Sequence, residues 1–287
     1  MARIKIFIDT SADMPEEIVK EKDIEVLRFL SVFGEDTYVT GKDLSNKEFY
    51  QKLEEFGDIP KTAQTPYADM YDAFLTASRE NDTVIYFCIS SKGSGQYNTA
   101  KMVVNDIKEN ENPDADIRVV DTMRFSAYIT LGACFAADLA EKGEDADTII
   151  EKTLEFISEW QAYILVDSLK YLEKGGRITK TAAIVGTLLD IKPVLTVNDG
   201  LIEPLEKIRG KKKVLKKLVE LMLENPNFDS EKKQVMIVHS NDEYAESLDE
   251  IIKEEVGVDP IYRLEMGPVV GTHIGPGTIA VLFRLKK

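Results

Sequence analysis

The alternation of apolar strands with amphipathic helices in the first half of the chain constrains the fold most strongly. Residues 84–89 form an unbroken apolar run, and residues 117–120 predict another strand. The helix between them places its apolar side chains on one face, at Ala100, Val103, Val104 and Ile107. A strand that is apolar throughout is typical of a parallel sheet covered by helices on both faces. We therefore expect an α/β fold whose N-terminal part is Rossmann-like.

The second half of the chain predicts a different architecture. Strands are expected at residues 162–166, 191–197 and 235–238, and helices at residues 180–189, 212–223 and 242–255. Asn198-Asp199-Gly200 follows one of these strands and is typical of a hairpin turn. Hairpin pairing mixed with helices predicts an α+β domain with a mixed sheet. We therefore expect two domains, at residues 1–160 and 161–287.

The composition limits the partners and the compartment of the protein. Its 287 residues carry a formal net charge of −15, which argues against nucleic-acid binding because phosphate contacts need clustered positive charge. Cys88 and Cys134 lie in apolar runs, and we interpret them as buried, reduced thiols of a cytoplasmic protein. A strand pattern begins at Ile4, so we expect no signal peptide, and no apolar run approaches the length of a membrane span.

A serine-rich turn at residues 90–95 is the best anion-binding candidate of the first domain. It follows a buried strand and precedes a helix, so backbone N–H groups and the positive end of the helix dipole are available there. The turn includes Ser94 and matches neither a Walker loop nor a dinucleotide fingerprint. A serine-capped turn without a ligand is the alternative. Thr62, shortly before another predicted helix, is a second candidate, with an ordinary helix cap as its alternative.

Two glycine-rich segments supply the candidates of the second domain. Residues 267–277 hold His273, one of only two histidines, among four glycines and two prolines that predict a rigid loop. A histidine held there is well placed to donate a hydrogen bond or a positive charge to a ligand, although most single histidines are structural. Arg177 follows two glycines that leave room for its guanidinium to bind an oxyanion. A surface arginine beside a helix start is the alternative.

Other polar residues are interpreted as structural. Asp9, Asp13 and Asp121 close strands at spacings that match no calcium or magnesium loop, so we expect capping and strand-end hydrogen bonds. His239 ends an apolar strand, where a structural position is favoured. Two histidines and two buried cysteines offer little to zinc, so we expect no metal site.

A basic cluster contrasts with the acidic chain. Its members are Lys207, Arg209, Lys211, Lys212, Lys213, Lys216 and Lys217. A solvated helix face is the default interpretation. A docking patch for an acidic partner or an anionic lipid surface is the alternative.

In their order along essentially the whole chain, these segments resemble the DegV family of bacterial lipid-binding proteins. The resemblance rests on residues 9–13, 62–64, 90–95, 119–122, 172–178, 191–193, 199–200, 207–210 and 271–277. It implies two α/β domains that bind one long-chain fatty acid, with the acyl chain buried and the ligand between the domains. It also implies that Thr62, Ser94 and His273 contact the carboxylate, with Thr272 nearby and Arg177 close to the head-group opening.

The resemblance further implies a role within a two-component system. In well-understood members the protein is the lipid-carrying, non-catalytic subunit of a fatty acid kinase. It presents the carboxylate to a separate ATP-binding subunit, which forms an acyl phosphate for phospholipid synthesis. The fatty acid is then the ligand, and the chain needs no other cofactor.

Three features leave the details open. Family members often carry a hydroxyl where Ala63 stands and a larger apolar residue where Gly93 stands, so the carboxylate network is expected to be thinner and the adjoining loop wider. Small residues in the helix over residues 127–140 could line an acyl tunnel, although tight helix packing explains them equally well. Two other functions remain open: a stand-alone phosphotransferase that uses the serine-rich turn, and a lipid-responsive regulatory module.

Overall fold

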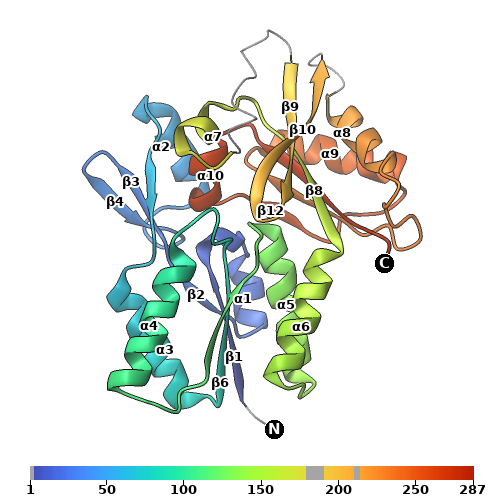
Figure 1. The fold of residues 1–287 in the computed structure, drawn as a ribbon. Coiled ribbons are helices and arrows are strands. Elements are labelled where there is room, and N and C mark those ends of the chain that lie inside the picture. The colour runs from blue at the N-terminus through green and yellow to red at the C-terminus, as the bar shows by residue number, and fades with distance from the viewer. Residues whose placement is uncertain (1–2, 179–190, 210–213) are drawn as a thin grey trace. The chain divides into compact units, whose positions relative to one another are not determined.

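The computed structural model describes residues 3–178, 191–209 and 214–287 (Figure 1). They form two compact units, of which the first contains residues 1–45 and 60–157. The second contains residues 46–59 and 158–287. The second unit thus includes residues 46–59, a segment that the expected boundary at residue 160 assigns to the N-terminal domain. The predicted helix over residues 180–189 lies outside the described residues.

A parallel sheet forms the centre of the first unit, as expected. Its strand order is β2 (Glu25–Leu27), β1 (Ile4–Asp9), β6 (Thr83–Cys88) and β7 (Ile117–Asp121). Every neighbouring pair is parallel. The apolar run that predicted β6 is explained by its position, because every residue of this strand is buried.

Helices cover both faces of this sheet, which confirms the predicted α/β class. They are α1 (Glu16–Glu21), α3 (Tyr67–Glu80), α4 (Gln96–Asn110), α5 (Ala127–Glu141) and α6 (Ala146–Ser158). In Figure 1, α3 and α4 lie on one side of β1 and β6, and α5 lies on the other. The predicted stripe of α4 is buried in full, whereas on α3 Met70 and Phe74 are buried and Tyr67 remains 38% exposed.

The first unit also contains a small antiparallel sheet that the sequence does not predict. β3 (Leu30–Phe33) lies between β4 (Asp36–Val39) and β5 (Lys61–Ala63). In register, Ser31 is paired with Tyr38 on one side and with Thr62 on the other. The strands are short, and Ser31 interrupts the apolar alternation of β3 although it is fully buried. Sequence periodicity therefore gives little signal for this sheet.

The second unit contains the predicted mixed sheet. Its strand order is β10 (Leu201–Arg209), β9 (Ile191–Asn198), β8 (Trp160–Leu165), β13 (Ile279–Arg284), β11 (Val235–His239) and β12 (Arg263–Glu265). Only β11 and β12 pair in parallel. The hairpin between β9 and β10 turns at Asp199 and Gly200, whose φ angles of 44° and 73° are those of a type I′ turn. This turn confirms the sequence interpretation.

The helices among the described residues of the second unit are α2 (Asn46–Phe56), α7 (Lys170–Gly175), α8 (Val214–Leu223), α9 (Asp242–Glu255) and α10 (Pro268–Ile274). The core beneath α8 and α9 includes Leu218, Met222, Leu248 and Ile252, all fully buried. α9 begins where its sequence predicts, since the Asn241 side chain accepts a hydrogen bond from the Tyr244 N–H at 3.1 Å.

The prediction of a rigid loop at residues 267–277 is wrong for the central part of this segment, which forms α10. Pro268 is the first residue of this helix, where its missing N–H costs no hydrogen bond. The helix ends at Gly275, whose φ of 90° is readily adopted only by glycine. Apart from Gly271, which lies inside the helix, the glycines and prolines that suggested a loop thus mark the two ends of a short helix, and His273 lies in its last turn.

No helix in residues 3–178, 191–209 or 214–287 combines the length and apolar composition that a membrane span needs. Cys88 and Cys134 are buried free thiols.

Candidate functional site

The serine-rich turn connects the end of β6 to the start of α4 and is held together by its own backbone. The N–H groups of Gly93 and Ser94 donate to the Ser90 carbonyl at 2.9 and 3.1 Å. The Ser94 hydroxyl lies at the N-terminal end of α4 and accepts a hydrogen bond from the Gln96 N–H at 3.3 Å. Ser94 is partly exposed. Its hydroxyl proton is therefore placed where the helix dipole favours a negatively charged ligand.

Two strand-end carboxylates fix this turn, as their sequence positions suggest. Asp9 accepts hydrogen bonds from the Ile89 N–H at 3.2 Å and from the Tyr86 hydroxyl at 2.7 Å. Asp121 accepts one from the Ser91 N–H at 3.1 Å. Burial raises the pKa of Asp9, although four hydrogen bonds to its carboxylate oppose that shift. The strand-end role expected for these carboxylates is confirmed.

Thr62 is not a helix cap, because it lies on β5, paired with Ser31 of β3. Helix α3 begins only at Tyr67, after Pro66, and the residue before a proline avoids helical conformation. The segment that follows Thr62 is tied to α4. Thr99 donates from its hydroxyl to Gln64 Oε1 at 2.7 Å, and Gln96 Nε2 donates to the Thr65 hydroxyl at 2.9 Å. The segments that carry Thr62 and Ser94 are therefore joined within one unit.

In the second unit, His273 packs closely against α7. A Cβ atom added to Gly175 would lie 2.7 Å from His273 Nδ1, so only glycine allows this approach. Burial, and to a smaller extent the positive charge of Arg177, together lower the pKa of His273 to about 4. The imidazole is therefore neutral near pH 7. It can form hydrogen bonds with a ligand. It does not supply a positive charge, which was the other role that the sequence allowed for His273.

Thr272 and Arg177 accompany His273. Thr272 is fully buried, and its hydroxyl has no hydrogen-bond partner among the described residues. The Arg177 guanidinium donates to the Gly175 carbonyl. The structure therefore groups the candidates by unit: Thr62 and Ser94 in the first, and Arg177, Thr272 and His273 in the second.

The departure at Gly93 has a structural cause. A Cβ atom at this position would lie 2.5 Å from Cε1 of Phe125. The Phe125 ring thus occupies the space that a larger residue would need, so the expected widening of the loop is wrong on this side.

The small residues of α5 serve helix packing. A Cβ atom on Gly132 would lie 2.4 Å from Cδ1 of Ile157 on α6, and Ala127, Ala133 and Ala136 are fully buried. Of the two explanations left open for this stripe, close packing of α5 against α6 thus accounts for Gly132.

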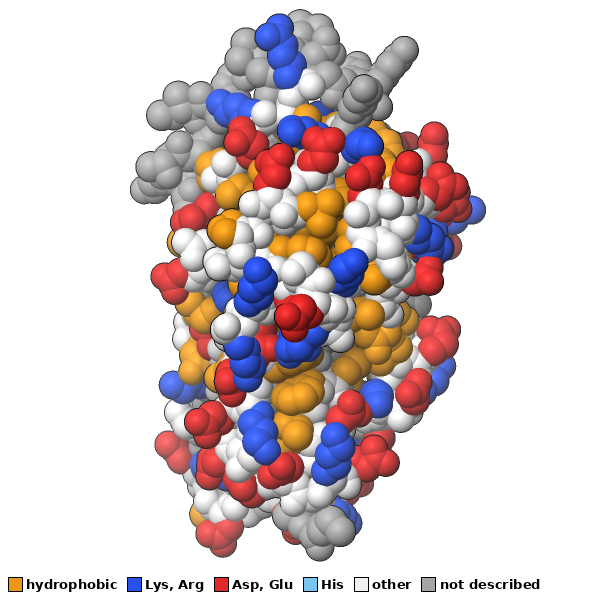
Figure 2. Space-filling view, turned by 90° about the vertical axis from the view of Figure 1, so that its right-hand side faces the viewer, with side chains coloured by type: hydrophobic (Ala, Val, Ile, Leu, Met, Phe, Trp, Pro, Cys, Tyr) orange, Lys and Arg blue, Asp and Glu red, His pale blue; other side chains and the backbone are white. Residues whose placement is uncertain are grey.

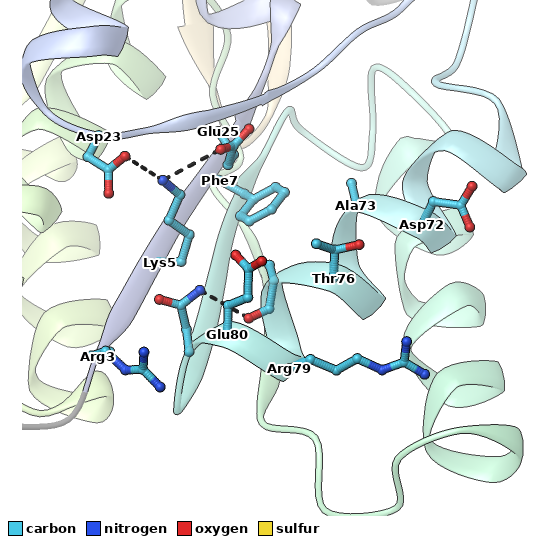
Figure 3. Close-up of a pocket in the computed structure, with 12 residues that line it drawn as sticks. Arg3, Lys5, Phe7, Asp23, Glu25, Asp72, Ala73, Thr76, Arg79 and Glu80 are labelled. Carbon is cyan, nitrogen blue, oxygen red and sulfur yellow. Dashed lines mark hydrogen bonds and ion pairs between the residues drawn. The ribbon is translucent and has the colours of Figure 1, made fainter.

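A cavity of about 850 Å³ lies beside β1 and the C-terminal half of α3 (Figure 3). Lys5 extends toward two carboxylates there, at 2.7 Å from Asp23 and 3.5 Å from Glu25. Neither Thr62 nor Ser94 lines this cavity. Ligands of parallel sheets bind at the carboxyl ends of strands, whereas this cavity flanks the start of β1 and its lysine is already paired. We assign it no ligand.

A second cavity, of about 520 Å³, lies in the second unit beside α2 and the end of β11. His239 lines it and is only 4% exposed, and burial lowers the pKa of this imidazole. The His239 carbonyl accepts the Met266 N–H at 2.7 Å. Across the described ranges, no three His, Cys, Asp or Glu side chains gather as a metal site would require.

The basic cluster is only partly described, since residues 210–213 lie outside the described ranges. Lys216 is paired with Glu255 at 2.5 Å and Lys217 with Glu220 at 2.9 Å, whereas Lys207 and Arg209 are exposed. Figure 2 shows cationic and anionic side chains interspersed over the described part of one face.

Sequence reasoning missed Gln96 and Ser31, both fully buried polar residues of the first unit. Each occupies a position where the local pattern calls for an apolar residue. That mismatch is the signal that could have identified them.

The chain is similar to known proteins over nearly its whole length. A family model that describes an uncharacterised protein of the DegV family matches residues 3–286. A DegV domain-containing protein from Clostridium perfringens is 37% identical, over 99% of this chain and 98% of the relative. The structure of a fatty acid binding DegV family protein from Streptococcus agalactiae is 30% identical with a TM-score of 0.86, and both chains are covered in full (100% each). That of a stearic acid-binding protein from Eubacterium ventriosum is 25% identical with a TM-score of 0.87, over 98% of each chain.

Proposed function

The chain belongs to the DegV family, and from this membership we propose that it binds one long-chain fatty acid with the acyl chain buried. The likeness over both full chains to a fatty acid binding protein from Streptococcus agalactiae carries the proposal. Each buried methylene contributes roughly 0.8 kcal/mol, so a long acyl chain alone supplies substantial affinity. The Eubacterium ventriosum protein is described as binding stearic acid, which belongs to the class of ligand proposed here.

We propose that the fatty acid is bound by Thr62, Ser94, Arg177, Thr272 and His273. Of these, Thr62, Ser94 and His273 contact the carboxylate, Thr272 lies nearby, and Arg177 lies close to the head-group opening. A carboxylate removed from water needs donors for its oxygens, and hydroxyl groups supply them without adding charge. The buried Thr272 hydroxyl lacks a hydrogen-bond partner among the described residues, as expected of a donor whose acceptor is a ligand. Ser94 lies at a helix start, and neutral His273 can donate from one ring nitrogen.

The reaction itself is assigned to a partner. The sequence contains no Walker loop or dinucleotide fingerprint, so ATP is expected on a separate kinase subunit. There a carboxylate oxygen would attack the γ-phosphorus, with release of ADP, to give an acyl phosphate for phospholipid synthesis. This chain is then the non-catalytic, lipid-carrying subunit. Lys207 and Arg209, exposed and next to the remaining lysines in sequence, are proposed to contact an anionic membrane surface transiently.

Thermal unfolding with three ligands tests the binding step. Stearic acid should raise the melting temperature more than octadecanol, which has the same chain length but no carboxylate, and magnesium-ATP should leave it unchanged. Stabilisation by magnesium-ATP alone would favour a stand-alone phosphotransferase instead.

Trapping of acyl phosphate with hydroxylamine tests the division of labour. The lipid-loaded chain mixed with ATP alone should give no hydroxamate, and addition of an ATP-binding kinase subunit should produce it. Hydroxamate formed without that subunit would contradict a non-catalytic role.

A further inference from the structure

Ser31 is a fully buried serine whose hydroxyl has no hydrogen-bond partner among the described residues. Burying a hydroxyl without a partner costs free energy, so native proteins nearly always provide one. Some other buried hydroxyls of the same unit are bonded, since Thr40 donates to the Phe29 carbonyl at 2.9 Å and Thr130 to the Ala12 carbonyl at 2.7 Å, whereas Thr153 has no partner among the described residues. An unpartnered buried hydroxyl calls for an explanation, and the position of Ser31 in the small sheet offers one.

The register of the small sheet places Ser31 beside Thr62. The two residues are directly paired between β3 and β5, so their side chains lie on one face of the sheet with Cβ atoms roughly 4.5–5.5 Å apart. One carboxylate group is small enough to meet both hydroxyls at that separation.

Two aromatic residues, Phe33 and Tyr38, share this face of the sheet with Ser31. Tyr38 is its partner on β4, and the ring of Tyr38 contacts that of Phe33 edge to face, with centroids 6.2 Å apart. The Ser31 hydroxyl has no hydrogen-bond partner among the described residues. It is therefore available as a donor to a ligand.

We propose that Ser31 is a further carboxylate-binding residue, whose hydroxyl donates a hydrogen bond to the bound fatty acid beside Thr62. This inference rests on the proposed fatty acid binding. It adds a donor from the central strand of the small sheet to those of the serine-rich turn.

The test compares the affinities of wild type and Ser31→Ala for stearic acid and for octadecanol. Loss of a hydrogen bond to a charged group should weaken stearic acid binding about tenfold or more and leave octadecanol binding within about twofold. Alanine removes an unpartnered hydroxyl from a buried site, so the ligand-free variant should unfold at or above the wild-type midpoint. Such a midpoint would show that weaker binding of stearic acid by Ser31→Ala is not caused by unfolding of the variant.

Thr153→Val is the matched control. Thr153 is also fully buried in the first unit with an unpartnered hydroxyl, but it lies on α6 against Gly132. Its replacement should not change the ratio of the two affinities. Equal ratios in wild type and Ser31→Ala, with wild type binding stearic acid, would overturn the Ser31 assignment alone. Failure of wild type to bind stearic acid would instead overturn the proposed function.

Discussion

The fully buried side chain of Gln96 exchanges two hydrogen bonds with Thr65. The Thr65 N–H donates to Gln96 Oε1 at 3.2 Å, and Gln96 Nε2 donates to Thr65 Oγ1 at 2.9 Å. Gln96 opens α4 just after the serine-rich turn, and Thr65 lies between β5 and α3. One amide thus fixes the spacing between the segments that carry Ser94 and Thr62.

Replacement of Gln96 by leucine should separate these two segments. The change leaves the N–H and hydroxyl of Thr65 unpaired in a buried site, so the free energy of unfolding should fall by about 1–3 kcal/mol. Binding of stearic acid should weaken because two proposed donors lose their fixed spacing. Urea unfolding and a binding titration measure the two effects. Gln51→Leu, at an exposed position of α2, is the control and should change neither quantity.

Replacement of Gly93 by alanine should destabilise the turn through contact with Phe125. The added methyl group would lie 2.5 Å from the ring, and overpacking of this kind costs about 1–3 kcal/mol. A double-mutant cycle with Phe125→Ala isolates the contact. Most of the cost of Gly93→Ala should disappear in the Phe125→Ala background, and an unchanged cost would rule out the ring as its cause.

The stability of the ligand-free protein should depend on pH through His273. Its pKa is about 4 in the folded chain, below the ordinary value of 6.5. Between these values the unfolded chain binds a proton that the folded chain does not, so the free energy of unfolding falls as pH decreases from 6.5 toward 4. The contribution of one group is at most about 1.4 kcal/mol per pH unit. In His273→Asn the slope between pH 6.5 and 5 should be smaller than in wild type.

His239 complicates this slope, because burial also lowers its pKa. The variants His239→Asn and His239→Asn/His273→Asn separate the two contributions. Equal slopes in His239→Asn and in the double variant would contradict a depressed pKa at His273.

The effect of the Arg177 charge on the pKa of His273 should be measurable. Arg177→Met removes a positive charge that disfavours the imidazolium, so the pKa of His273 should rise from about 4 toward 6.5. An NMR titration of the imidazole protons measures it, and with only two histidines in the chain His239→Asn assigns the signals. Lys174→Met, on the same short helix α7, is the control and should shift the pKa less.

The sequence predicts those helices, strands and turns whose local residue pattern matches their burial and backbone conformation in the folded chain. The apolar run of β6 reports burial on both faces, and Asp199-Gly200 has the backbone freedom that a type I′ turn requires. These features are local and need no knowledge of the tertiary structure.

The features that were missed depend on contacts between distant segments. β5 contains only Lys61–Ala63 and exists because β3 pairs with it. Gln96 and Ser31 are polar residues in buried positions, and their roles follow from Thr65 and Thr62, each about 31 residues away in the chain. Three of the four glycines in residues 267–277 flank α10 and Gly271 lies inside it, so the local composition indicates a loop where a short helix forms. A pattern read along one segment cannot supply these relationships.

Mass spectrometry of lipid extracted from freshly purified protein tests fatty acid binding most directly. We expect one long-chain fatty acid per chain, and protein stripped of this lipid should regain its higher melting temperature when stearic acid is added. Absence of extractable lipid, together with an unchanged melting temperature after addition of stearic acid, would contradict fatty acid binding.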